Sequence, residues 1–237
     1  MTLLASSGAL AAVEPSCYSR LVNEWICGQY LTDRKQELID ATVQHLWITA
    51  AAIVLGILIA FPMALLARRV PRLESGILGV STGLYTVPSL ALIPLLVPFT
   101  GITATTVVIA LALYALTILV RSLLDGLRSV PEEVRESATG LGYAPSSLLF
   151  RIELPLALPV VMAGLRVATV STVALTTVGT LVGHGGLGNL ISDGVTQNFK
   201  AELFAACVLC VLIALALDVL IVGAQRLLTP WTRRGTR

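Results

Sequence analysis

The sequence predicts an all-α polytopic membrane protein with about five core transmembrane helices, on three observations. The 237-residue chain is 56% hydrophobic and 13% charged, whereas a soluble domain carries about 25% charged residues. Its mean hydropathy is +0.87. Five apolar stretches of about 21–24 residues follow one another, and each can cross the hydrocarbon layer as a tilted helix. These stretches argue against the alternative, a very apolar soluble bundle.

The five stretches cover residues 45–67, 76–99, 102–124, 160–182 and 203–223. In lipid, every backbone polar group must be satisfied within the protein, so only helices or closed barrels can span the bilayer. Barrel strands would alternate in hydrophobicity over about ten residues. The long, non-alternating runs therefore predict helices embedded in a lipid bilayer.

The distribution of Lys and Arg predicts the orientation of these spans. The second connection carries no charge, and the fourth carries only Lys200 against Asp193 and Glu202. The positive-inside rule therefore places the N-terminus outside the cell and the C-terminus in the cytoplasm. The arginines of the first connection, the third connection and the tail are Arg68, Arg69, Arg72, Arg121, Arg128, Arg135, Arg151, Arg226, Arg233, Arg234 and Arg237.

Three parts of the chain follow: an extracytoplasmic segment (1–44), a transmembrane domain (45–225) and a cytoplasmic tail (226–237). Residues 31–46 have apolar side chains at roughly helical spacing, which fits either an interfacial amphipathic helix or a plain extension of the first span. The N-terminus, MTLLASSGALAAV, lacks the positive region of a signal peptide, so we treat it as part of the mature chain.

Four cysteines divide between two settings. Cys207 and Cys210 lie within an apolar run and are expected to be small hydrophobic fillers. Cys17 and Cys27 lie in the polar N-terminal segment. An extracytoplasmic position allows them to form a disulfide, although a spacing of ten residues does not by itself require one.

The longest polar connection, residues 128–159, has the pattern of two short helices joined by a glycine turn. Ser129 is a candidate N-cap, Pro131 a candidate first residue, and two glutamates follow in the first turn. The first helix is expected to end near Leu141, and Gly142 permits a left-handed turn. A second short helix is expected to start at Ala144-Pro145-Ser146. Pro155 and Pro159 are expected to break it before the fourth span.

This connection resembles the EAA loop of ATP-binding-cassette importer permeases. That loop has Glu-Ala-Ala, three residues, Gly, nine residues and then Ile-x-Leu-Pro, and every spacing agrees here. Ser137 departs from the pattern, as one small residue in place of another. The matching residues are Glu136, Ser137, Ala138, Gly142, Ile152, Leu154 and Pro155.

The resemblance implies a type I ABC importer permease fold in which this loop is the coupling helix. It would dock on a dimer of separate cytoplasmic ATPase subunits, and ATP and Mg would be bound there and not by this chain. The resemblance also implies a second permease protomer, either the same chain or a homologous one, and an extracytoplasmic substrate-binding protein. The mechanism would be alternating access in a bacterial inner membrane.

Two further segments are candidates for the gate and translocation path. On the expected outer side, the chain reads VGHGGLGNLISDG, and its glycines allow backbone conformations closed to other residues. Leu190 and Ile191 are expected to start a short helix there. His184 is expected to be a loop residue, with contact to substrate or pH sensing as the alternative. The candidate gate residues of this segment are Gly185, Gly186, Leu187 and Gly188.

In the second stretch, Thr86, Pro88 and Ser89 are the corresponding candidates. Pro88, Pro94 and Pro98 are expected to kink this span, and carbonyls freed near Thr86 and Val87 to face the path. Together with ELPLALPVVMAGLR and the glycine segment, this stretch resembles the osmoprotectant branch of the family. That branch takes up glycine betaine, carnitine, choline or proline betaine. Another importer branch, for methionine or a different small nutrient, is the alternative.

Arg166 and Asp218 are charged residues within expected spans, where a charge is costly and usually has a partner. They either approach each other or extend separately to the interface. A secondary transporter would need several acidic residues within the membrane, and Asp218 is the one available. A non-transporting scaffold would leave the EAA pattern unexplained.

Other classes of function are disfavoured by what the sequence lacks. The sequence contains no GxxxxGK[ST] phosphate loop, no metal-ligand spacing and no catalytic residue set in a plausible setting. Its arginines sit at the ends of apolar runs, so no nucleic-acid partner is expected. We therefore expect no enzyme activity, no metal and no cofactor bound by this chain.

Overall fold

A computed structural model of the chain describes residues 16–231, and every regular element in that range is a helix. The expected all-α fold is therefore confirmed for these residues. The MTLLASSGALAAV segment lies outside the described residues, as do Arg233, Arg234 and Arg237 of the expected tail.

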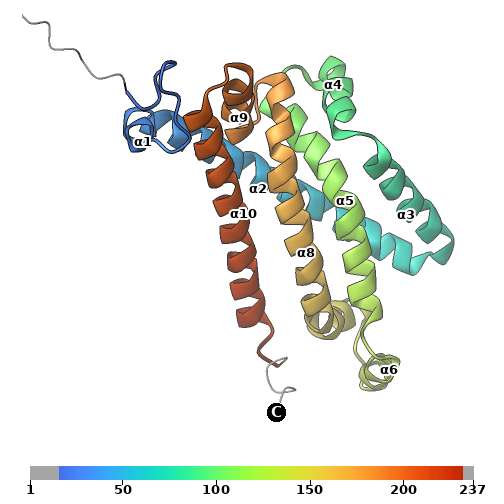
Figure 1. Cartoon of the computed structure of the whole chain (residues 1–237). Coiled ribbons are helices and arrows are strands. Elements are labelled where there is room, and N and C mark those ends of the chain that lie inside the picture. Colours follow the sequence, from blue (N-terminus) through green and yellow to red (C-terminus); the bar gives the residue numbers. More distant parts are fainter. Residues whose placement is uncertain (1–15, 232–237) are drawn as a thin grey trace, which may run out of the picture.

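The long helices α5, α8 and α10 run side by side between two ends of a bundle, and α2 crosses behind them at an angle (Figure 1). We call one end the α6 end, and the other, where α1, α4 and α9 lie, the α9 end. In chain order the elements are α1 (Gly28–Asp33), α2 (Lys35–Arg69), α3 (Pro71–Thr86), α4 (Ser89–Thr100), α5 (Ala104–Arg128), α6 (Glu132–Gly140), α7 (Pro145–Leu148), a π-helical turn (Leu149–Glu153), α8 (Leu154–Thr176), a 3-10 helix (Thr177–Val182), α9 (Leu187–Thr196) and α10 (Lys200–Leu228).

Helix α5 is the centre of the bundle and packs against α2, α3, α4 and α8. Small residues let these helices approach closely: a Cβ added at Gly164 of α8 would lie 1.8 Å from Ser122 Oγ, and one at Gly126 would lie 3.1 Å from the Ala157 carbonyl. Lipid tails are as apolar as leucine, so close packing of this kind, rather than hydrophobic exclusion from water, holds spans together.

Four described segments are long and apolar enough to cross a membrane: α2, α5, the run Pro145–Val182 and α10. Helices α3 and α4 meet the same test only as a pair, bent by 101°. The most apolar window of α5 is 67% buried, whereas that of α10 is 17% buried. Much of the surface of α10 is therefore left for lipid or for another chain.

The second expected span is divided rather than kinked, and this corrects the sequence-based expectation. The chain leaves helical geometry at Val87 (φ −68°, ψ 126°), because the ring of Pro88 disfavours α geometry in the residue before it. Pro94 and Pro98 lie inside α4 without breaking it. The Val87 carbonyl, which was expected to face a path, accepts a hydrogen bond from the Tyr114 hydroxyl of α5.

The expected break at Pro155 and Pro159 is also wrong, because helical geometry continues from α7 through the π-helical turn into α8. Pro155 lies in the first turn of α8, where the wider π-helical turn before it relaxes the demand for a regular hydrogen bond. At the other end of the bundle, α2 begins at Lys35 and continues without interruption. Residues 35–46 are thus a helical extension of the first span.

Candidate functional site

The segment between α5 and α8 forms a helical hairpin, α6–α7, that projects at the α6 end of the bundle (Figure 1). Glu132 and Glu133 occupy the first turn of α6, where negative charge favours the helix dipole. Ser129 does not cap this helix, contrary to expectation. Ser129 is instead the C-cap residue of α5, with helical backbone angles, and its hydroxyl donates to the Gly126 carbonyl at 2.7 Å.

The turn of the hairpin depends on the spacing between Ala138 and Gly142. Gly142 has φ +84° and donates its N–H to the Thr139 carbonyl at 2.9 Å, while Tyr143 donates to the Ala138 carbonyl at 3.2 Å. This pair of bonds is the Schellman motif, which requires a left-handed residue after the helix. The glycine of the EAA pattern therefore determines where α6 stops and where the chain turns.

One face of the hairpin is open to its surroundings. Glu136 and Ser137 are exposed, whereas Ala138 is buried against the rest of the chain. Leu141 is 80% exposed and Phe150 is 56% exposed. Leu141 follows α6 at the turn of the hairpin, whereas Phe150 lies in the π-helical turn with its ring centroid 6.4 Å from that of Phe61. The rest of the pattern lies in the π-helical turn and the start of α8, where Ile152, Leu154 and Pro155 are partly buried.

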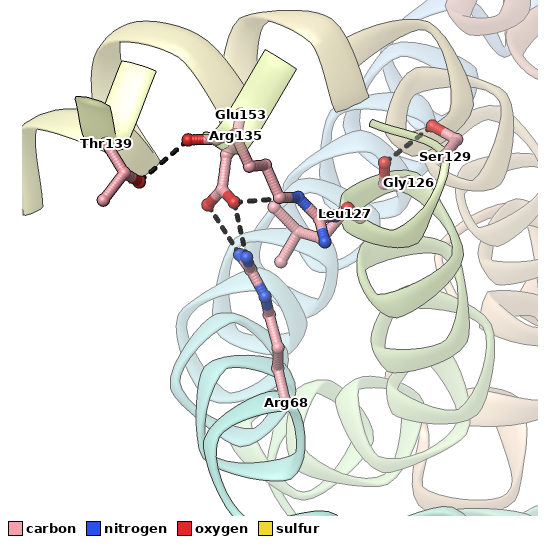
Figure 2. A network of polar contacts seen from close by, with 7 residues as sticks. All are labelled: Arg68, Gly126, Leu127, Ser129, Arg135, Thr139 and Glu153. Atoms are coloured by element: carbon pink, nitrogen blue, oxygen red, sulfur yellow. Dashed lines mark hydrogen bonds and ion pairs between the residues drawn. The ribbon is translucent and has the colours of Figure 1, made fainter. Parts of the chain in front are cut away.

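A buried carboxylate joins this hairpin to the bundle (Figure 2). Glu153 lies in the π-helical turn, and its side chain is 2% exposed. The Arg68 guanidinium donates to both of its oxygens, at 2.7 and 2.5 Å. Arg135 of α6 lies on the other side, with Nε 3.2 Å from Glu153 Oε1, and it also donates to the Leu127 carbonyl.

At the α9 end, the glycine segment is a tight loop between the 3-10 helix and α9. Gly183 and Gly186 have φ of +71° and +56°. A Cβ added at Gly188 would lie 2.3 Å from the Thr177 carbonyl oxygen, and one at Gly185 would lie 2.6 Å from the Thr180 nitrogen. Gly183 and Gly186 are therefore needed for their backbone angles, and Gly185 and Gly188 for close approach. Gly186 is needed for close approach as well, because a Cβ there would lie 2.7 Å from His45.

Polar side chains from two helices hold this loop. Asn189 accepts from the Gly185 N–H and donates to the Gly183 carbonyl, both at 3.0 Å. His45 of α2 is fully buried beneath Gly186, with its Nε2 3.0 Å from the Val173 carbonyl. Leu187 is fully buried, and His184 lies 3.4 Å from the Gln44 amide.

The N-terminal segment covers the connection between α9 and α10. Cys17 and Cys27 are joined in the structure, with Cα atoms 5.7 Å apart. The Asn23 amide donates to the Asn198 carbonyl at 2.7 Å and accepts from the Lys200 N–H at 3.0 Å. These contacts attach a disulfide-closed loop to the end of the α9–α10 turn.

Aromatic side chains complete that attachment. Tyr18, Tyr30 and Phe199 contact one another with ring centroids 5.3–6.2 Å apart, and Tyr30 meets the other two rings edge to face. Tyr18 donates to Asp33 Oδ2 at 2.8 Å, and this hydrogen bond raises the pKa of Tyr18, because its loss on deprotonation would leave two anions together. The hydroxyl therefore stays protonated at neutral pH.

Thr86, Pro88 and Ser89 lie at the bend between α3 and α4. The Thr86 hydroxyl donates to the Gly83 carbonyl at 2.7 Å. Helix α4 packs on the 3-10 helix that precedes the glycine loop. The two candidate segments for the translocation path are thus connected through α4, well away from the α6–α7 hairpin (Figure 1).

Arg166 of α8 and Asp218 of α10 lie against each other between their two helices. The guanidinium donates through Nε and Nη2 to the two carboxylate oxygens at 2.7 and 2.8 Å. This two-point geometry is the strongest that an arginine and a carboxylate adopt. It links two helices, α8 and α10, that pack against each other.

The sequence and the fold match those of known transporters. The family model described as "Binding-protein-dependent transport system inner membrane component" matches residues 40–234. The chain belongs to this family. It is a multi-pass protein of the bacterial inner membrane and the permease subunit of a binding-protein-dependent importer, as the EAA pattern predicted.

Curated relatives support the same assignment. The permease is 31% identical to the choline transport system permease protein OpuBB of Bacillus subtilis (strain 168), over 85% of this chain and 93% of the relative. It is 35% identical to the osmoprotectant import permease protein OsmW of Salmonella typhimurium, over 85% and 96%. It is 32% identical to the carnitine transport permease protein OpuCB of Listeria monocytogenes, over 88% and 95%.

Solved structures confirm the type I importer fold. A permease chain of the MetNI methionine ABC transporter, in an inward-facing conformation, matches with a TM-score of 0.73 at 19% identity, over 83% of this chain and 98% of that chain. A chain of an amino acid ABC transporter crystallised with histidines matches with a TM-score of 0.60 at 16% identity, over 85% and 97%. At these identities the likeness concerns the fold alone.

Sequence reasoning missed three side chains that the structure places at these sites: Glu153, His45 and Asn189. Glu153 lies inside the EAA pattern, at a position where the pattern allows any residue, so its own chemistry was the only signal. His45 was noted only as the start of a span. A histidine and an asparagine flanking apolar or glycine-rich runs could have been singled out, because polar groups there need partners.

Proposed function

We propose that this permease imports quaternary-ammonium osmoprotectants of the glycine betaine, carnitine, choline and proline betaine class. This chain aligns with almost the whole length of the relatives named for choline, carnitine and osmoprotectant transport. The methionine transporter shares only its fold. Between the two importer branches considered, sequence identity therefore favours the osmoprotectant branch.

The α6–α7 hairpin is the docking element for a dimer of separate cytoplasmic ATPase subunits. The observation that carries this proposal is the exposed, Schellman-closed turn at Gly142, at the end of the bundle where the arginines gather. ATP and Mg are bound by those ATPases, and this chain supplies no catalytic residue, metal or cofactor. The arginines also favour a cytoplasmic α6 end, with the N-terminus outside.

The glycine loop and the α3–α4 bend line the path near its outer gate. A second permease protomer, the same chain or a homologous one, completes the path, because so few spans enclose little space alone. An extracytoplasmic binding protein delivers the solute to the α9 end. ATP-driven movement of the hairpin then alternates access between the two sides.

The docking proposal is tested by co-purification with the ATPase subunit of the same importer. Gly142→Pro removes the N–H that bonds to Thr139 and forbids the positive φ, so capture of the ATPase is expected to be lost. Gly142→Asn tolerates left-handed geometry and is expected to retain capture. Equal capture by both variants would contradict the proposal.

The substrate class is tested with the permease, its ATPase and its binding protein together in liposomes. Glycine betaine, carnitine or choline is expected to stimulate ATP hydrolysis and to accumulate inside, while methionine does neither. Stimulation by methionine alone would favour the rival importer branch. Uptake driven by a proton or sodium gradient without ATP would favour a secondary transporter instead.

A further inference from the structure

Three separate segments meet at the Glu153 side chain. Arg68 lies in the last turn of α2, Arg135 lies in α6, and Glu153 lies in the π-helical turn that leads into α8. Figure 2 shows the two guanidinium groups approaching the carboxylate from different sides. The hairpin is thus linked to α2 and α8 through one acidic side chain.

The setting of this carboxylate makes the contact more than a surface ion pair. Glu153 is 2% exposed, whereas the side chains of Arg68 and Arg135 are 30% and 28% exposed. A buried carboxylate is tolerated only when it is paired and hydrogen-bonded. Removing it would leave two positive groups facing each other with no anion between them.

Apolar contacts near the carboxylate also hold these segments in fixed positions relative to one another. Leu127, Val130, Leu149 and Ala157 form a small buried cluster, which Leu65 of α2 also contacts. Arg135 additionally donates to the Leu127 carbonyl at the end of α5. The base of the hairpin is therefore attached to α2, α5 and α8, while its tip at Leu141 is free for a partner.

We propose that Glu153 is a positioning residue that transmits movement of the α6–α7 hairpin to α2 and α8 together. This inference rests on the proposed docking of an ATPase at the hairpin. A displaced hairpin carries Arg135 with it, and the shared carboxylate carries Arg68 and the start of α8. Without the carboxylate, the hairpin still docks but moves separately from α2.

The two-point contact of Arg68 is the step that reaches α2. A lysine at that position keeps the charge but makes only a single-point contact with the carboxylate. Arg68→Lys is therefore expected to transmit hairpin movement less well than the natural residue, and better than a variant without the carboxylate.

The test compares transport with ATP consumption in proteoliposomes that contain the whole complex and its binding protein. Glu153→Gln keeps the shape of the side chain and removes its charge. We expect solute transported per ATP hydrolysed to fall about tenfold, the size of a typical coupling between sites. Arg68→Lys should give an intermediate ratio.

The matched control is Glu74→Gln, the same chemical change at the same end of the bundle. Glu74 of α3 pairs with Arg128, whose side chain is 56% exposed. This variant is expected to keep the wild-type ratio. A fall in the ratio as large as that of Glu153→Gln would overturn the inference, since any lost charge would then suffice.

A double variant separates coupling from folding. Arg68→Gln/Glu153→Gln removes a charge from each side, so its melting temperature is expected to recover relative to Glu153→Gln, while the transport ratio stays low. Recovery of both would overturn the inference, because the carboxylate would then serve stability alone. An unchanged ratio in folded Glu153→Gln would overturn it as well.

Failure of the proposed function is distinguishable from failure of this inference. A wild-type chain that captures no ATPase would overturn both. Wild-type capture and coupling, together with normal coupling in Glu153→Gln, would overturn the inference alone.

Discussion

Arg166 of α8 and Asp218 of α10 form a two-point ion pair, with Nε and Nη2 of the arginine 2.7 and 2.8 Å from the two carboxylate oxygens. Both residues lie within segments apolar enough to cross the membrane. Charges at such positions are tolerated when they are paired. The pair therefore fixes the rotation of α10 about its axis relative to α8. The largely apolar sequence of α10 specifies that rotation only weakly.

Breaking this pair from one side is expected to destabilise the permease. Asp218→Asn leaves the Arg166 charge without its anion in an apolar segment, so the melting temperature in lipid nanodiscs should fall. Arg166→Gln/Asp218→Asn removes both charges and should melt between the single variant and wild type. A double variant that melts below Asp218→Asn would argue against the pairing.

The α3–α4 bend is expected to depend on the Tyr114 hydroxyl. Tyr114→Phe removes the donor to the Val87 carbonyl, and a partly buried carbonyl without a donor costs about 1–2 kcal/mol. The unfolding free energy, measured by denaturant titration in mild detergent, should fall by that amount. Tyr85→Phe keeps the ring contact with Tyr114 and serves as the control, with a smaller change expected.

The glycine loop is expected to tolerate side chains unequally. A Cβ at Gly188 would lie 2.3 Å from the Thr177 carbonyl oxygen, whereas one at Gly183 meets nothing within 4 Å. Gly188→Ala should therefore cost about 1–3 kcal/mol through steric overlap. Gly183→Ala should cost about 1 kcal/mol through its positive φ alone. The order of the two melting temperatures checks this, and the reverse order would contradict it.

The cysteines are expected to divide into one bonded pair and two thiols. Cys17 and Cys27 are bonded to each other, and Cys207 and Cys210 are free. Closing a loop of this length stabilises a fold by about 3 kcal/mol in the chain-entropy model. A maleimide added after denaturation should label Cys207 and Cys210 alone without reductant, and all four cysteines after reduction.

Full labelling without reductant would contradict the disulfide and, with it, the oxidising side assigned to the N-terminal segment. Cys17→Ser/Cys27→Ser gives the matched control. It should show no increase in labelling on reduction, and it should melt at a lower temperature than wild type.

Local patterns were enough to predict the spans and the hairpin turn. Apolar runs long enough for a bilayer correctly predicted α2, α5, α8 and α10, because the requirement to satisfy the backbone in lipid acts on each segment alone. Gly142 was predicted for its left-handed turn, because a Schellman motif is a relation between residues only five positions apart. The family followed from the same short-range spacing.

Two predictions failed because neighbouring elements altered a local preference. Prolines at positions 155 and 159 were expected to break a helix, yet helical geometry continues from the π-helical turn into α8. Pro155 lies in the first turn of α8, where a missing N–H is tolerated, and Pro159 lies inside α8 without ending it. All three prolines of the second stretch were expected to kink it, yet only Pro88 divides it. There, the Tyr114 hydroxyl of another helix donates a hydrogen bond to the freed Val87 carbonyl.

The sequence by itself determined the class of protein: its spans, the EAA spacing and the residues able to carry a charge or a disulfide. Only the tertiary structure decided the partners, such as Glu153 with Arg68, which lie 85 residues apart. The physical reason is that hydrophobicity and backbone geometry act within a segment. The partner of a buried charge depends on how helices distant in the sequence pack together, and the residue pattern within a single segment does not contain that information.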